Sequence, residues 1–81
     1  MYVSDWCGYC RRATSLLRQK QVTFSEINVE EDEKSRADMI ARSNRHTVPQ
    51  IFVGDRHVGG YDELYALDRS GELDRLIQGA G

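Results

Sequence analysis

Met1-Tyr2-Val3-Ser4-Asp5-Trp6-Cys7-Gly8-Tyr9-Cys10 opens the chain, and this stretch decides the fold. Residues 1–4 predict a short strand. The apolar positions that follow recur at helical spacing and predict a helix from Tyr9 to about Lys20; they are Cys10, Ala13, Leu16 and Leu17. The two cysteines therefore lie where a strand passes into a helix, and the exit of a strand is where open α/β sheets carry their sites.

The remainder of the chain predicts further strands and helices in alternation. We expect a strand over 22–29, a helix over about 32–43, a strand over 48–53, a hairpin strand over 57–59, a helix capped by Asp62 and ended by a left-handed Gly71, and a last helical segment over 72–77. The residues expected to face inward on the two middle helices are Ala37, Ile40, Ala41, Leu64, Tyr65 and Leu67. Strands joined by a helix run parallel, and the hairpin adds antiparallel strands. The pattern predicts an α/β fold with a four-stranded mixed sheet flanked by helices, in a single domain spanning residues 1–81.

Composition narrows the class of protein. The chain has 81 residues, 40% hydrophobic and 30% charged, which is typical of a small globular domain. It shows no apolar run of about 18 residues and no secretory pattern at its start, so we expect neither a membrane span nor a signal peptide. The net charge is −2 with both signs mixed, and no basic stripe argues for nucleic-acid binding.

Both cysteines lie in one local pair, Cys7 and Cys10. Disulfide-stapled secreted domains of this size typically carry more cysteines, so the pair is interpreted as chemical and predicts a reducing compartment, the cytoplasm. Backbone amides and the dipole at a helix N-terminus stabilise a thiolate. Cys7 is expected at that position and Cys10 one turn further in, facing inward. We therefore expect Cys7 to attack and Cys10 to resolve.

Two other interpretations of the pair are disfavoured. A zinc site would need a second pair of ligands, but His46 and His57 are separated by ten residues, against a usual three to five, and both are expected at the surface. A pair of inert buried cysteines is disfavoured by Gly8 and Tyr9 at a strand-to-helix junction.

Three motifs, Trp6–Ala13, Thr47–Val53 and Gly59–Leu64, resemble those of glutaredoxins in order and spacing, and the likeness runs along nearly the whole chain. It is closest to the small bacterial dithiol type. The resemblance implies a thioredoxin fold and the reduction of protein disulfides and glutathione mixed disulfides at the expense of glutathione. It also implies glutathione as co-substrate, disulfide-containing or glutathionylated proteins as partners, and a monomer.

The resemblance assigns roles around the thiol. Cys7 becomes the nucleophile that takes up glutathione as a mixed disulfide, and Tyr9 flanks that disulfide. Thr47-Val48-Pro49 resembles the family's loop with a cis proline, in which backbone groups of Val48 pair with the glutathione cysteine like an added strand.

A second group of residues is assigned to the ends of glutathione. Gly59-Gly60 lets a ligand approach the backbone closely. The amides of Tyr61 and Asp62 open a helix and suit the γ-glutamyl carboxylate, while the Asp62 carboxylate suits the ammonium group. Arg36 lies where the family often contacts the glycine carboxylate.

Departures from the family keep an alternative open. Gly8 replaces a frequent proline, Ser4 replaces a frequent lysine, and the first strand is short by a few residues. Some relatives with glycine after the first cysteine hold a two-iron, two-sulfur cluster between two protomers, with Cys7 and glutathione as ligands. A thioredoxin-like donor that ignores glutathione is a third interpretation, and Gly60 and Asp62 argue against it.

Overall fold

The computed structural model describes residues 1–80, and the order of elements follows the sequence pattern. The elements are β1 (Tyr2–Val3), α1 (Gly8–Gln19), β2 (Ile27–Asn28), α2 (Glu33–Ser43), β3 (Ile51–Val53), β4 (Arg56–Gly59), α3 (Tyr61–Ser70) and α4 (Glu72–Ala80). The strands predicted over 22–29 and 48–53 are shorter than expected, because only their later residues pair with a neighbour. The predicted domain boundary at residue 81 lies outside the described residues.

The strands form two pairs. β1 is parallel to β2, with Tyr2 opposite Ile27, and β3 is antiparallel to β4. A single antiparallel bridge joins the pairs, in which Tyr2 and Gln50 exchange N–H···O bonds of 2.9 and 3.1 Å. The predicted continuous four-stranded sheet is therefore divided, since β1 has two residues and reaches the third strand at one position only.

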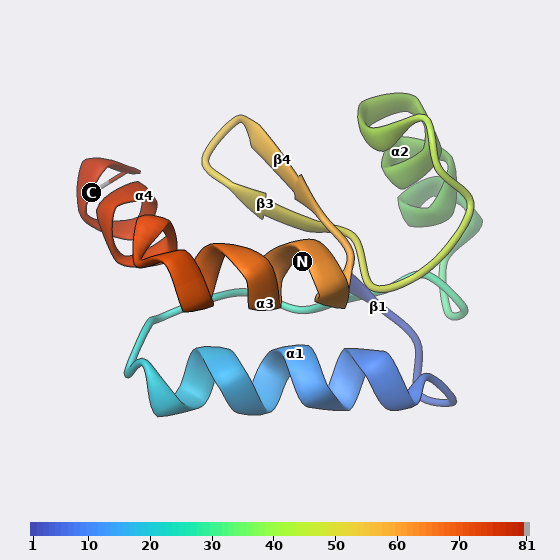
Figure 1. Cartoon of the computed structure of the whole chain (residues 1–81). Coiled ribbons are helices and arrows are strands. Elements are labelled where there is room, and N and C mark those ends of the chain that lie inside the picture. The colour runs from blue at the N-terminus through green and yellow to red at the C-terminus, as the bar shows by residue number, and fades with distance from the viewer. Residues whose placement is uncertain (81) are drawn as a thin grey trace.

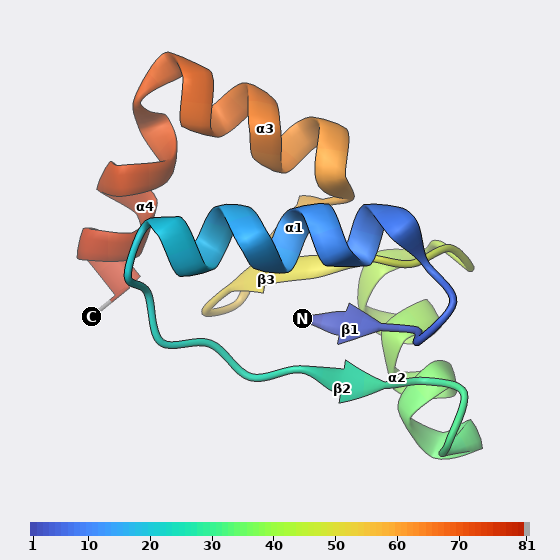
Figure 2. The same cartoon turned by 90° about the horizontal axis from the view of Figure 1, so that it is seen from below.

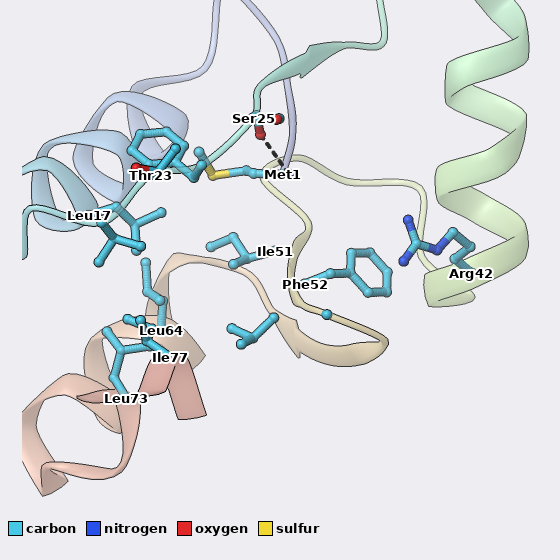
Figure 3. A pocket seen from close by; sticks show the side chains of 14 residues that line it. Met1, Leu17, Thr23, Ser25, Arg42, Ile51, Phe52, Leu64, Leu73 and Ile77 are labelled. Atoms are coloured by element: carbon cyan, nitrogen blue, oxygen red, sulfur yellow. Dashed lines mark hydrogen bonds between the residues drawn. The ribbon is translucent and has the colours of Figure 1, made fainter. Parts of the chain in front are cut away.

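A cavity of about 460 Å³ lies where the two pairs of strands part (Figure 3). Residues 22–25, before β2, and residues 51–54, at β3, line two of its walls, and Met1, Arg42 of α2 and core side chains of α1, α3 and α4 line the rest. The Met1 amine donates a hydrogen bond to the Ser25 carbonyl oxygen over 2.9 Å beside it. Burial, and secondly the charge of Arg42, lower the pKa of this amine.

Helices α1 and α3 lie side by side with their N-termini at the same end of the molecule, and α2 stands apart from them (Figures 1 and 2). The larger core cluster packs α1, β3, α3 and α4 together through Ala13, Leu17, Ile51, Leu64 and Leu73. The smaller one packs α2 against β1 and the end of β2 through Tyr2, Val29 and Met39. The arrangement places the start of α1, with its cysteines, next to the start of α3.

Three residues predicted to be buried are exposed: Ala37, Ala41 and Tyr65. Helix α2 buries only a narrow stripe, Met39 and Ser43, which are four residues apart and so share one face. Tyr65 is 42% exposed because it points along the surface between α3 and α1, where it lines a groove rather than the core.

The ends of α3 were predicted in part. Gly71 ends the helix in the left-handed conformation at φ 83°, as expected. Asp62 is not the N-cap: Gly60 holds that position in an extended conformation, without a side-chain cap, and Asp62 is already the second helical residue. Among residues 1–80, no helix is both long and apolar enough to cross a membrane.

Candidate active site

Cys7 is the N-cap of α1. Its backbone is extended, at φ −100° and ψ 111°, and its Sγ accepts a hydrogen bond from the Cys10 N–H over 3.2 Å. The sulfur thus takes the place of the oxygen that usually caps a helix. A thiolate at this position faces unpaired amides and the positive end of the helix dipole.

Cys10 has a different environment. Its side chain is 3% exposed, on the inner face of α1 beside Ala13 and Leu17. Burial, and secondly the hydrogen bond with Cys7, raise the pKa of the Cys10 thiol to about 12. Both cysteines are free thiols and Cys7 is partly exposed. The pair therefore combines an accessible sulfur with one that stays protonated at neutral pH.

The loop before β3 lies against the accessible sulfur. The Cys7 thiol donates a hydrogen bond to the Val48 carbonyl oxygen at 3.4 Å, and the Val48–Pro49 peptide bond is cis, as the sequence resemblance implied. Backbone groups of this loop are therefore next to the thiol.

A groove of about 250 Å³ opens beside this loop. It brings together seven residues named from the sequence: Tyr9, Thr47, Val48, Pro49, Gly60, Tyr61 and Asp62. Gly60 borders it closely, since a Cβ there would lie 3.6 Å from the Pro49 carbonyl oxygen. Arg36 is exposed on α2 and is not among the lining residues.

Three lining residues were missed from the sequence: Arg45, Gln50 and Glu63. Arg45 Nη1 lies 2.7 Å from Glu63 Oε1, and this guanidinium is the main cause that lowers the pKa of the Glu63 carboxyl. The pair lies against Gly59, which has φ +118°, and a Cβ there would be 2.9 Å from Glu63 Oε1. The open backbone at Gly59 therefore accommodates this ion pair. Glutamate three residues after an N-cap is a known helix-start signal, whereas nothing local points to Arg45.

Gln50 ties the loop to the hairpin. Its side chain is 1% exposed, and its Nε2 donates to the Thr47 carbonyl oxygen at 3.0 Å and to Thr47 Oγ1 at 3.2 Å. His57 Nε2 donates in turn to Gln50 Oε1 over 2.7 Å. Burial, and secondly the charge of Arg45, lower the pKa of His57. His57 is thus a partly buried member of a network, rather than the surface residue that was expected.

Comparison with known proteins agrees with this geometry. A glutaredoxin family model matches residues 1–58. The chain is 47% identical over 78 residues to glutaredoxin 3 of Escherichia coli K12, covering 96% of this chain and 94% of the relative. It is 46% identical over 77 residues to a glutaredoxin of Pseudomonas aeruginosa, covering 95% and 92%.

Solved structures show the same fold. The crystal structure of a buckwheat glutaredoxin–glutathione complex superposes with a TM-score of 0.90 at 26% identity, covering 99% of this chain and 76% of that one. The solution structure of a glutaredoxin from Brucella melitensis gives a TM-score of 0.82 at 49% identity, covering 94% and 83%. The thioredoxin fold implied by the sequence is confirmed. The chain belongs to the glutaredoxin family and is a glutathione-dependent thiol–disulfide oxidoreductase.

Proposed function

We propose that Cys7 is the attacking thiol, that Cys10 is the resolving thiol, and that glutathione binds in the groove between the loop 47–49 and the start of α3. For a glutathionylated protein, the Cys7 thiolate attacks the glutathione sulfur and the protein thiolate leaves. A second glutathione thiolate then attacks the Cys7 mixed disulfide, which releases oxidised glutathione and restores Cys7. For a protein disulfide, the Cys7 thiolate attacks one sulfur and forms a mixed disulfide with the protein. Cys10 then attacks the Cys7 sulfur, which forms the Cys7–Cys10 disulfide and releases the reduced protein. Two glutathione thiolates in turn reduce the Cys7–Cys10 disulfide and leave as oxidised glutathione.

One observation carries this proposal: the accessible sulfur of Cys7 lies 3.4 Å from the Val48 carbonyl oxygen, at the edge of the groove. A tripeptide bonded to Cys7 would therefore lie along the backbone of residues 47–49, where it can pair like an added strand. The difference in burial between the two cysteines supports the order of attack.

Groups that line the groove suit the charged ends of glutathione. The start of α3 has no side-chain cap, so the amides of Tyr61 and Asp62 suit the γ-glutamyl carboxylate. The exposed Asp62 carboxylate suits the ammonium group beside it. For the glycine carboxylate, Arg45 is the guanidinium that lines the groove, and we assign it this role in preference to Arg36.

Asp62→Asn tests the glutathione site. The change keeps the size of the side chain and removes its charge, so we expect roughly 5–30-fold more glutathione to be needed for half-maximal turnover, the equivalent of about 1–2 kcal/mol. Glu72→Gln is the matched control, since Glu72 is an exposed carboxylate in the first turn of α4 and lines none of the grooves described. Both variants lose a similar helix-dipole interaction of about 0.3–1 kcal/mol. If the two variants need the same glutathione concentration for half-maximal turnover, Asp62 does not contact glutathione.

A second candidate function is a glutathione-ligated two-iron, two-sulfur cluster held between two copies of the chain. It is favoured by Gly8, which keeps a backbone N–H next to Cys7 that a proline at this position would lack. Within residues 1–80 no group of three or more His, Cys, Asp or Glu side chains could hold a metal, so ligands besides Cys7 would come from glutathione and the second copy. The visible spectrum of protein purified without oxygen in the presence of glutathione tests this directly. A colourless monomer rejects it.

We further propose that the protein is located in the cytoplasm and is a monomer when no substrate is bound. A free dithiol with no other cysteine in the chain suits a reducing compartment. Sedimentation of the reduced protein tests the monomer.

A further inference from the structure

A second groove, distinct from the one proposed for glutathione, runs between α1 and α3. It has a volume of about 390 Å³ and is lined by Arg11, Arg12, Ser15, Leu16, Gln19, Tyr61, Tyr65 and Asp68. Tyr61 lines both grooves, so this one continues directly from the active site. Helices α1 and α3 run parallel in Figure 1, so the groove between them extends away from the N-terminal ends of both helices.

Three tyrosine rings form a row that leads from the first groove into this one. The Tyr9 and Tyr61 ring centroids are 6.2 Å apart, and those of Tyr61 and Tyr65 are 6.0 Å apart. Arg12 lies 5.4 Å over the Tyr9 ring, and Arg69 lies 5.7 Å over the Tyr65 ring. Tyr9 is 55% exposed, and Trp6, next to Cys7, is 86% exposed. Tyrosine, tryptophan and arginine are the residue types enriched in protein interfaces and their energetic centres.

The charge of the groove is opposite to that of the whole molecule. The chain carries a net charge of −2, yet Arg11 and Arg12 line the groove and Arg69 borders it. Among the lining residues of the described chain, Asp68 is the single carboxylate, and Lys20 pairs with it at 2.5 Å. A negatively charged segment would therefore find uncompensated guanidinium groups there.

We propose that the groove between α1 and α3 docks an acidic segment of the protein substrate, next to the substrate cysteine whose disulfide, with glutathione or with another cysteine, Cys7 opens. This inference rests on the proposed function and adds the chemistry of the partner. A helix of 12 residues is about 18 Å long, and an extended chain covers about 3.3 Å per residue. The groove is thus long enough to bind roughly five or six residues on one side of the target cysteine. We expect carboxylates of this segment to pair with Arg11, Arg12 and Arg69, and an apolar side chain to pack on the tyrosine row.

Two glutathionylated peptides of equal length test the proposal, one with glutamates and one with lysines within that distance of the cysteine. We expect the glutamate peptide to show a higher kcat/KM by roughly tenfold at low salt, mainly through KM, with a preference that shrinks as salt is added. Arg12→Glu and Arg69→Glu should each reduce or invert the ratio of the two kcat/KM values. Using the ratio cancels any change in the reactivity of Cys7 itself.

Arg75→Glu is the matched control, because it makes the same charge change at an exposed position of α4 that lines none of the grooves described. It should leave the ratio unchanged. The glutathione mixed disulfide of mercaptoethanol, which cannot reach the groove, reports the proposed function alone. The docking surface is wrong, and the proposed function stands, if the parent turns over this small disulfide but shows no preference between the two peptides. The same conclusion follows if Arg75→Glu shifts the ratio of the two kcat/KM values as much as Arg12→Glu does. If the small disulfide is not turned over, the proposed function itself fails.

Discussion

The Cys7 Sγ atom and the Val48 carbonyl oxygen lie 3.4 Å apart, although the two residues are 41 positions apart in the sequence. This contact joins the start of α1 to the loop before β3. Cys7, the loop and the groove are therefore one unit that depends on tertiary packing as much as on the local motif around the cysteines.

Alkylation with iodoacetamide should distinguish the two cysteines. Burial, and secondly the hydrogen bond with Cys7, raise the pKa of the Cys10 thiol to about 12, so at pH 7–9 the reagent should modify Cys7 alone. Peptide mass mapping of the reduced protein over this pH range is the measurement. The Cys7→Ser variant is the control, since its only remaining cysteine is buried. Rapid alkylation of Cys10 in that variant, with the pH dependence of a free cysteine near about 8.5, would contradict the assignment.

Gln50→Ala should destabilise the protein and loosen the active-site loop. The change removes two hydrogen bonds to Thr47 and the acceptor for His57, and it leaves buried polar groups unpaired, at a cost of about 1–3 kcal/mol in the free energy of unfolding. Urea unfolding measures this. Gln78→Ala, at an exposed position of α4, should change stability by about 0.5 kcal/mol or less. Equal free energies of unfolding in the two variants would show that the hydrogen bonds of Gln50 do not stabilise the protein.

His57 should make stability depend on pH. Burial, and secondly Arg45, lower the pKa of His57 in the folded protein, so it is protonated more readily in the unfolded chain, whose histidine pKa is about 6.5. Unfolding then takes up a proton below about pH 6.5, and stability falls as the pH drops through that range. His57→Gln should flatten this part of the profile, measured by urea unfolding between pH 5 and 7. His46→Gln, at an exposed histidine, serves as control, and identical slopes in the two variants would refute the linkage.

Local patterns predicted the elements that position Cys7. The strand exit and the helical spacing after Tyr9 placed Cys7 and Cys10 correctly, because both depend on short-range spacing, whereas the cap expected at Asp62 put the start of α3 too late, since Gly60 is the N-cap. The family resemblance supplied the loop at Val48-Pro49, which lies beside Cys7 as it implied.

Features that arise from packing between distant segments were missed. The Arg45–Glu63 pair joins residues 18 positions apart, and the buried Gln50 side chain depends on where Thr47 and His57 come to lie. Helical spacing alone placed Ala37 and Ala41 inward, but the narrow contact of α2 with the strands buries Met39 instead. The division of the sheet follows from the shortness of β1, which no single-segment pattern describes.

The most direct test of the account is turnover of a glutathionylated peptide, coupled to glutathione reductase, by Cys7→Ser and Cys10→Ser. Removing one glutathione needs a single attack by the accessible sulfur, whereas the buried sulfur is needed only to resolve a mixed disulfide with a protein. Cys10→Ser should therefore keep its activity on this substrate and, when free glutathione is left out, should retain one glutathione on Cys7, seen by mass spectrometry. Cys7→Ser should be inactive and form no adduct. Activity that survives in Cys7→Ser, or is lost in Cys10→Ser, would contradict the assignment of Cys7 as the nucleophile.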